Sequence, residues 1–224
     1  MPLQRVLEPE VMDTVEEAVD YDKMDHSEVN ELFVKDLLAF AREHGFEFQQ
    51  ALDLGTGTAL IPIELCKSHP TVNVMAVDLA GEMLKLAKQN VQAKNLADRI
   101  ELQLLDAKNL PFSDGQFSSV ISNSIVHHIP EPETCISEVT RVVATGGLIF
   151  VKDLMRPDNA EQVKQIVQTY AGSENAHSQQ MFDDSLRAAL SLDEIRDLVS
   201  KQGFDRNTVT ATSDRHWAWT AIRH

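Results

Sequence analysis

The stretch Ala51-Leu52-Asp53-Leu54-Gly55-Thr56-Gly57-Thr58 decides the fold of this chain. It reads as an apolar strand that ends in an acidic residue, turns at two glycines and opens into a helix near residues 59–68. Two glycines one residue apart permit a tight turn in which the backbone can come close to a ligand. The following helix directs unpaired N–H groups and a partial positive charge at that turn. The carboxylate of Asp53 disfavours a pyrophosphate there and favours a ligand that carries an ammonium group.

The composition is that of one α/β domain of ordinary size, with 224 residues of which 43% are hydrophobic and 25% charged. The net charge of −15 repels a phosphate backbone, so we expect no nucleic-acid partner. Residues 1–17 lack the apolar segment of a signal peptide, and the longest apolar stretch, 148–151, is too short to cross a bilayer. The two cysteines, Cys66 and Cys135, have no paired spacing, so the sequence predicts a cytoplasmic protein without a metal site.

Strands and helices alternate along the chain after residue 45. Short apolar, β-branched segments predict strands at 51–53, 72–77, 100–105, 117–122 and 148–151. Helices are predicted near 59–68, 81–94 and 132–143. This alternation indicates a Rossmann-like, doubly wound α/β fold with a mostly parallel sheet and helices on both faces. The alternating segments 208–212 and 217–222 predict a C-terminal antiparallel hairpin that completes a seven-stranded sheet.

The segments around this core have other patterns. Residues 1–26 show little regular periodicity, and Ser27 is a predicted N-cap for a helix that ends near His44. Between 155 and 190 the sequence is polar and helix-prone, with a soft loop at 171–180. A capping box then begins a further helix at Ser191.

Acidic residues stand at the ends of three predicted strands, namely Asp53, Asp78 and Asp106. A carboxylate at the end of the second strand suits the two hydroxyl groups of a ribose. Asp106 can accept from an adenine amine, while the N–H of Ala107 donates to a ring nitrogen. Taken singly, Asp53 and Asp78 are equally well explained as strand-end or helix-capping carboxylates, and Asp106 is better explained as a surface carboxylate. Together they predict one crevice for a nucleoside-containing ligand.

Residues 45–155 resemble the core of class I S-adenosylmethionine-dependent methyltransferases. Within that family they are most similar to the small-molecule branch that includes the ubiquinone and menaquinone biosynthesis methyltransferases. The matching segments are Ala51–Thr58, Ala76–Asp78, Leu105–Ala107 with Leu110–Phe112, Ser122–Ile129 and Thr145–Leu148. Ala59 departs from the family pattern, which often has a third glycine there.

The resemblance implies S-adenosylmethionine as cofactor, S-adenosylhomocysteine as product and a small molecule as methyl acceptor. It implies that Asp53 lies near the amino-acid portion of the cofactor and that Asp78 holds the ribose. The residues expected around the cofactor are Asp53, Gly55, Thr56, Gly57, Asp78, Leu79, Met83, Asp106, Ala107 and Asn123.

The resemblance also divides the chain into two parts. In similar enzymes an N-terminal arm folds across the cofactor, so residues 1–44 are predicted to be a lid that brings Tyr21 near the sulfonium. A disordered tail is the alternative. Residues 45–224 are the expected methyltransferase domain, with an insertion at 155–190 over the acceptor pocket.

A sulfonium methyl group is already electrophilic, so the protein must mainly align the acceptor and exclude water. His127 and His128 follow the fourth predicted strand, where the acceptor is expected. Either imidazole can serve as a base or orient the acceptor. The alternative for each is packing at a helix entry before Pro130.

Two other functions remain open at this point. A nicotinamide-dependent oxidoreductase fits Gly55, Gly57 and Asp78, although Asp53 and Asp106 argue against it. A methyltransferase-like protein that binds the cofactor without catalysis is the other. The sequence leaves open the acceptor, the atom that is methylated and the oligomeric state.

Overall fold

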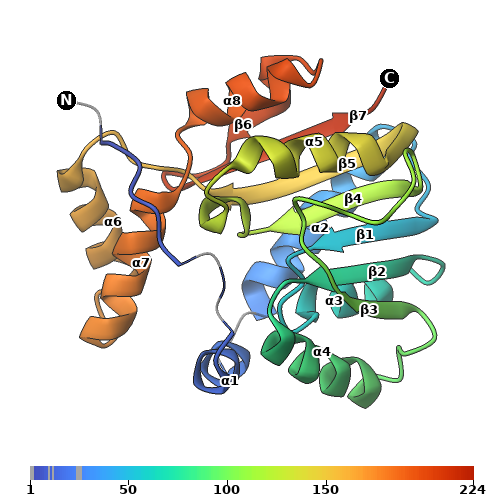
Figure 1. The fold of residues 1–224 in the computed structure, drawn as a ribbon, viewed down its shortest axis with the longest axis horizontal. Coiled ribbons are helices and arrows are strands. Elements are labelled where there is room, and N and C mark those ends of the chain that lie inside the picture. Colours follow the sequence, from blue (N-terminus) through green and yellow to red (C-terminus); the bar gives the residue numbers. More distant parts are fainter. Residues whose placement is uncertain (1–2, 10, 12, 24–26) are drawn as a thin grey trace.

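The computed structural model describes residues 3–9, 11, 13–23 and 27–224 (Figure 1). Tyr21 belongs to the first helix, but its side chain lies outside this description, so its predicted place near the sulfonium stays a prediction. Among the helices of these residues, none is long and apolar enough to cross a membrane.

A seven-stranded sheet in the order β3-β2-β1-β4-β5-β7-β6 forms the centre of the molecule. Its strands are β1 (Gln50–Leu54), β2 (Asn73–Asp78), β3 (Ile100–Leu104), β4 (Phe117–Asn123), β5 (Val143–Leu154), β6 (Val209–Ala211) and β7 (His216–Ile222). The first five are parallel, while β7 runs antiparallel to both β5 and β6. The predicted mostly parallel, doubly wound sheet with a C-terminal antiparallel hairpin is thereby confirmed.

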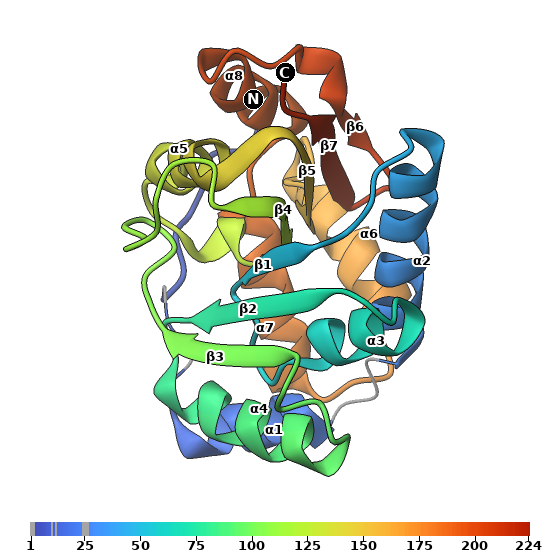
Figure 2. The same ribbon diagram turned by 90° about the vertical axis from the view of Figure 1, so that its right-hand side faces the viewer.

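Helices cover both faces of the sheet (Figure 2). One face carries α2 (Ser27–Glu43), α3 (Leu60–Ser68) and α4 (Gly81–Ala93), and the other carries α5 (Pro132–Val142) and α8 (Leu192–Lys201). The rings of Phe33 and Phe150 meet edge to face in the first core, with centroids 5.1 Å apart. Trp217 and Trp219 are fully buried in the second. Because both faces are packed, the carboxyl ends of the strands are held rigidly.

The helix α1 (Val15–Lys23) lies in a segment that the sequence predicted to have little regular structure. Its buried Ala18 packs against Ala80 and Met83, at the start of α4. This helix depends on a tertiary contact and so has only a weak signal in its own periodicity.

The insertion at 155–190 forms two paired helices, α6 (Ala160–Ala171) and α7 (Ala176–Ala188). The prediction of a soft loop at 171–180 is wrong for its second half, because α7 begins there. The side chain of Asn175 caps that helix by accepting from the N–H of Ser178. Both helices lie beyond the carboxyl end of β5 (Figure 1).

The N-terminal arm is the segment before α1, and its residues 3–9 run beside α7 (Figure 1). The N–H of Val6 donates to the carbonyl of Arg187 at 3.1 Å. The guanidinium of Arg5 donates to the carbonyls of Ala188, His127 and Ile129, at 2.6, 3.1 and 2.9 Å. The arm is therefore tied to the segment that follows β4 as well as to α7.

The turn after β1 has a left-handed backbone at Gly55, Gly57 and Ala59, with φ values of 68°, 54° and 63°. Only glycine adopts this conformation freely, which explains why the family often has a third glycine where this chain has Ala59. A Cβ at Gly55 would overlap Cγ2 of Ile125. Because Gly55 has no side chain, Ile125 from the segment after β4 can pack against this turn.

We expect Gly55→Ala to lower the free energy of unfolding by about 2–4 kcal/mol, because it adds an overlap with Ile125 to the left-handed strain. Gly45→Ala is the matched control, since Gly45 has a φ of 61° and nothing within 4 Å of an added Cβ. Its loss should be about 1–2 kcal/mol. Urea denaturation of both variants measures the difference, and equal losses would contradict the packing role of Ile125.

Candidate functional site

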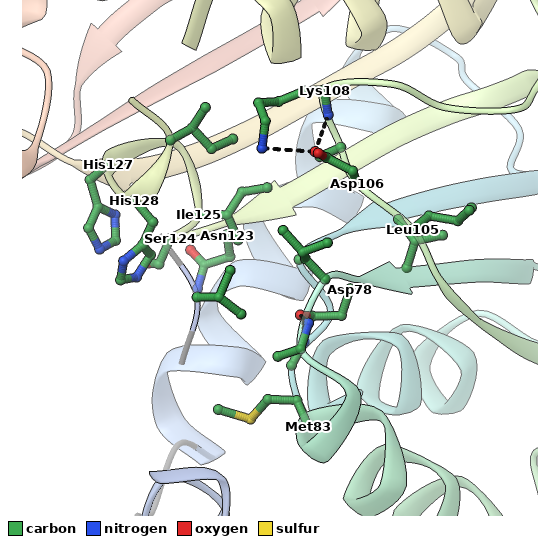
Figure 3. A pocket seen from close by; sticks show the side chains of 18 of the residues that line it. Asp78, Met83, Leu105, Asp106, Lys108, Asn123, Ser124, Ile125, His127 and His128 are labelled. Carbon is green, nitrogen blue, oxygen red and sulfur yellow. Dashed lines mark hydrogen bonds and ion pairs between the residues drawn. The ribbon is translucent and has the colours of Figure 1, made fainter. Parts of the chain in front are cut away.

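A cavity of about 320 Å³ opens at the carboxyl ends of the parallel strands (Figure 3). Its volume is that of a small-ligand pocket. It lies where β1 has neighbours β2 and β4, whose connections leave from opposite faces of the sheet. Most of the lining comes from the carboxyl ends of β1 to β4 and the segments that follow them. The other lining residues are Val11 of the arm, Leu154 at the end of β5, and Phe182 and Ser185 of α7.

The predicted cofactor residues gather at this cavity. Gly55, Gly57, Asp78, Leu79, Met83, Asp106, Ala107 and Asn123 line it. Asp53 and Thr56 lie in an adjoining recess, whose lining also includes Gly55 and Asn123. Figure 3 shows Asp78 and Asp106 on one side of the cavity and the two histidines on the other, with Asn123 and Ile125 between them.

Asp78 ends β2 and holds the glycine turn. Its Oδ2 accepts from the N–H of Gly57 at 2.7 Å, and its Oδ1 accepts from the N–H of Ala80 at 2.8 Å. Burial raises the pKa of Asp78, although these N–H groups oppose the rise. Because a carboxylate has about four acceptor positions, it retains the capacity to bind two hydroxyl groups.

Asp53 is buried below the turn, with 2% of its surface exposed. Burial raises its pKa to about 7, the hydroxyl of Thr56 opposes the rise, and the charge of Asp78 adds to it. The recess beside it has a volume of about 20 Å³, room for one water-sized group. The buried hydroxyl of Thr58, which also lines the recess, has no hydrogen-bond partner among the residues described. A small cationic donor would suit both groups.

Asp106 follows β3 at the opposite end of the acidic row. Its Oδ1 accepts from the N–H of Lys108 at 2.9 Å and lies 3.0 Å from the Nζ of the same residue. These bonds fix the carboxyl group at the cavity rim.

His127 is buried between two carboxylates. Its Nδ1 lies 2.5 Å from Oδ1 of Asp153, whose Oδ2 accepts from the N–H of Val126, and its Nε2 lies 3.5 Å from Oε1 of Glu8. Burial alone would lower the pKa of His127, but the two carboxylates outweigh it and raise the pKa. The same contacts lower the pKa of Asp153 against its burial. Its Nδ1 is occupied by Asp153 and its ring is buried, so His127 is poorly placed to act as a base.

His128 lines the cavity beside His127, with their ring centroids 4.1 Å apart. Its Nδ1 lies 3.1 Å from Oε1 of Glu8, and the hydroxyl of Ser185 donates to the other oxygen of Glu8 at 3.1 Å. The sequence analysis missed Glu8, which has no local signal because the arm joins the site only through tertiary contacts. It also missed Asp153, although an acidic residue at the end of an apolar strand was the signal that found Asp53 and Asp78.

Comparison with known proteins identifies the core of the chain. A family model described as a methyltransferase domain matches residues 52–151. The demethylmenaquinone methyltransferase of Porphyromonas gingivalis is 29% identical over 164 residues, which cover 68% of this chain and 66% of that protein. The ubiquinone/menaquinone biosynthesis C-methyltransferase UbiE of Pseudomonas fluorescens is 28% identical over 170 residues, 71% of this chain and 66% of that one. The chain thus spans slightly less than two thirds of the length of these relatives.

Solved structures share the fold over nearly the whole chain. A SAM-dependent methyltransferase from Aquifex aeolicus has a TM-score of 0.66 at 17% identity, covering 93% of this chain and 97% of its own. The plantazolicin methyltransferase BpumL, solved with a monoazolic desmethylPZN analog and SAH, has a TM-score of 0.72 at 13% identity, with coverage of 92% and 89%. Residues 52–151 thus match a methyltransferase domain, and the chain is similar to ubiquinone and menaquinone biosynthesis methyltransferases.

Proposed function

We propose that the protein transfers the methyl group of S-adenosylmethionine to a small-molecule acceptor. The observation that carries the proposal is the polar recess at Asp53, which adjoins a cavity that Asp78 also lines. The hydroxyl of Thr58 in this recess has no hydrogen-bond partner among the described residues, and the recess has room for one water-sized group. Both features suit the ammonium group of the cofactor. The residues present therefore fit this cofactor.

Each part of the cofactor has a proposed partner. Asp53, Thr56 and Asn123 hold the amino-acid portion, beside the backbone of Gly55 and Gly57. Asp78 accepts from the ribose hydroxyls. Asp106 and the N–H of Ala107 bind the adenine edge, while Leu79 and Met83 pack against the nucleoside.

When bound, the cofactor supplies an electrophilic methyl group on its sulfonium. The protein then has to align the acceptor and keep water out. The side of the cavity away from Asp78 carries apolar Ile129, Leu154 and Phe182 together with His128. We infer an acceptor with an apolar body, oriented by His128, while the buried His127 supports the wall. Neither histidine is assigned the role of base.

The alternatives are less well supported. A nicotinamide cofactor would bring a pyrophosphate to the turn above Asp53, and the match of residues 52–151 to a methyltransferase domain favours methyl transfer. The net charge of −15 supports a small-molecule acceptor over a nucleic acid. The cytoplasmic location stays a prediction. A binding protein without catalysis differs in one measurable way, because it would form no S-adenosylhomocysteine with any acceptor.

We also propose that the part of residues 1–44 that precedes α2 acts as a lid, since α2 itself is packed on the sheet, and that 155–190 shapes the acceptor pocket. Val11 of the arm and Phe182 and Ser185 of α7 line the cavity, which supports both assignments. The bonds from Arg5 to the carbonyls of His127 and Ile129 support an arm that closes on the acceptor side.

Asp78→Ala should raise the dissociation constant of S-adenosylmethionine by about 10- to 150-fold, since charge-assisted hydrogen bonds to two hydroxyls are lost. Asp98→Ala, at an exposed carboxylate after α4, is the control and should bind as the wild type does. Calorimetric titration measures both affinities. Tight binding of NAD by the wild type, without binding of S-adenosylmethionine, would overturn the proposed function.

Asp53 should make cofactor binding depend on pH. Its pKa of about 7 means that it is largely protonated at pH 5.5, whereas the cofactor ammonium favours the ionised form. Affinity should therefore fall about 25-fold between pH 7.5 and 5.5, with release of a proton on binding at the lower pH. In Asp53→Asn this dependence should disappear. A pH profile that the variant shares with the wild type would place the titrating group elsewhere.

Deletion of residues 1–13 tests the lid. The sheet should still unfold cooperatively, while the affinity for S-adenosylmethionine should fall because closure over the sulfonium end is lost. Adenosine, which lacks that end, should bind almost unchanged. Dissociation constants for the two ligands, measured on full-length and shortened protein, decide the matter. Equal values for S-adenosylmethionine would show that the arm does not close over the cofactor.

A further inference from the structure

We propose that Glu8, His127 and His128 form a binding site for one divalent transition-metal ion of the Zn²⁺ class, which fastens the N-terminal arm to the wall of the cavity. Glu8 comes from the arm, and the two histidines come from the segment after β4. The proposal is independent of methyl transfer, since it concerns the protein without its cofactor. It departs from the sequence analysis, which predicted no metal site.

The spacing of the three ligand atoms suits one ion. Oε1 of Glu8 lies 3.5 Å from Nε2 of His127 and 3.1 Å from Nδ1 of His128, and all three atoms lie within 4.8 Å of one another. A tetrahedral ion with bonds of about 2.0–2.1 Å separates neighbouring ligand atoms by roughly 3.3–3.4 Å. The two distances to Glu8 fall on either side of that value, and the two imidazole nitrogens lie no more than 4.8 Å apart.

The polar atoms between the arm and the histidines are in contact but form no well-aligned hydrogen bond. Oε1 of Glu8 and Nδ1 of His128 are both buried, and within the described part of the chain neither makes a hydrogen bond of good geometry, although they are close together. Buried polar atoms in folded proteins are nearly always satisfied. A cation placed between them would complete both.

Hydrogen bonds to neighbouring residues orient two of the three proposed ligands. Asp153 lies 2.5 Å from Nδ1 of His127, which directs the other ring nitrogen toward Glu8. A carboxylate in this position fixes the ring and increases the basicity of a metal-bound imidazole. The hydroxyl of Ser185 donates to Oε2 of Glu8, which leaves Oε1 for the ion. The bond from Arg5 to the carbonyl of His127 holds the arm in register.

The donor set selects the class of ion. Two imidazole nitrogens and one carboxylate oxygen suit Zn²⁺ or Co²⁺, whereas Mg²⁺ and Ca²⁺ prefer oxygen ligands. Three protein ligands leave a position open for water or another small ligand. Because both histidines line the cavity, an ion held here can be reached from it.

The test is titration of the full-length, chelator-treated protein with Zn²⁺ by calorimetry, and with Co²⁺ by visible absorption, in the absence of cofactor. We expect one ion per chain and a rise in Tm on binding. Glu8→Gln and His128→Gln should each raise the dissociation constant at least about tenfold and lose the Tm rise. Glu16→Gln and His177→Gln, at exposed positions, should bind as the wild type does.

Mg²⁺ should give neither heat nor a Tm change. Absence of stoichiometric Zn²⁺ binding, or wild-type affinity in Glu8→Gln, would overturn the proposal. Glu8→Gln keeps the shape of a side chain on the arm, so it decides the question even if His128→Gln disturbs folding. These readouts do not involve S-adenosylmethionine, and a failure here leaves the proposed methyl transfer untouched.

Discussion

The hydrogen bond from the N–H of Gly57 to the carboxylate of Asp78 is the contact on which the rest of the site depends. It folds the glycine turn back over the end of β2, where the N–H groups of Gly55 and Thr56 both donate to the carbonyl of Val77. The turn in turn receives Ile125, because Gly55 has no side chain to exclude it. One bonded turn thus joins the ends of three neighbouring strands into a single cavity wall.

Three buried carboxylates lie along this edge of the sheet, and they differ in how far neighbouring groups offset the cost of burying their charge. Asp153 is neutralised by His127 and accepts from backbone N–H groups, so its pKa is lowered despite burial. Asp78 accepts from N–H groups, which offset its burial only in part. Asp53 has the weakest support, and its pKa rises to about 7. Because an uncompensated buried carboxyl group favours a cationic partner, the least satisfied residue marks the proposed position of the cofactor ammonium.

The other side of the cavity is built from distant parts of the chain. The arm contributes Arg5 and Glu8, the segment after β4 contributes His127 and His128, and α7 contributes Ser185. Hydrogen bonds and ion pairs between their polar groups join these three segments, which lie far apart in the sequence. This side of the cavity is therefore built from loops and an insertion, the parts of a fold that usually carry specificity on a fixed scaffold.

The sequence by itself determined the sheet, the order of its elements and the acidic row Asp53, Asp78 and Asp106, because strand periodicity, glycine turns and strand-end residues are local patterns. It also predicted that these three carboxylates lie at one edge of the sheet, as they do, since parallel strands bring their carboxyl ends together. Only the tertiary structure decided the helix α1, the start of α7 inside an expected loop, the recess at Asp53 and the meeting of Glu8 with the two histidines. Those features depend on contacts between residues far apart in the chain, and such contacts leave no periodic signal in the segments that make them.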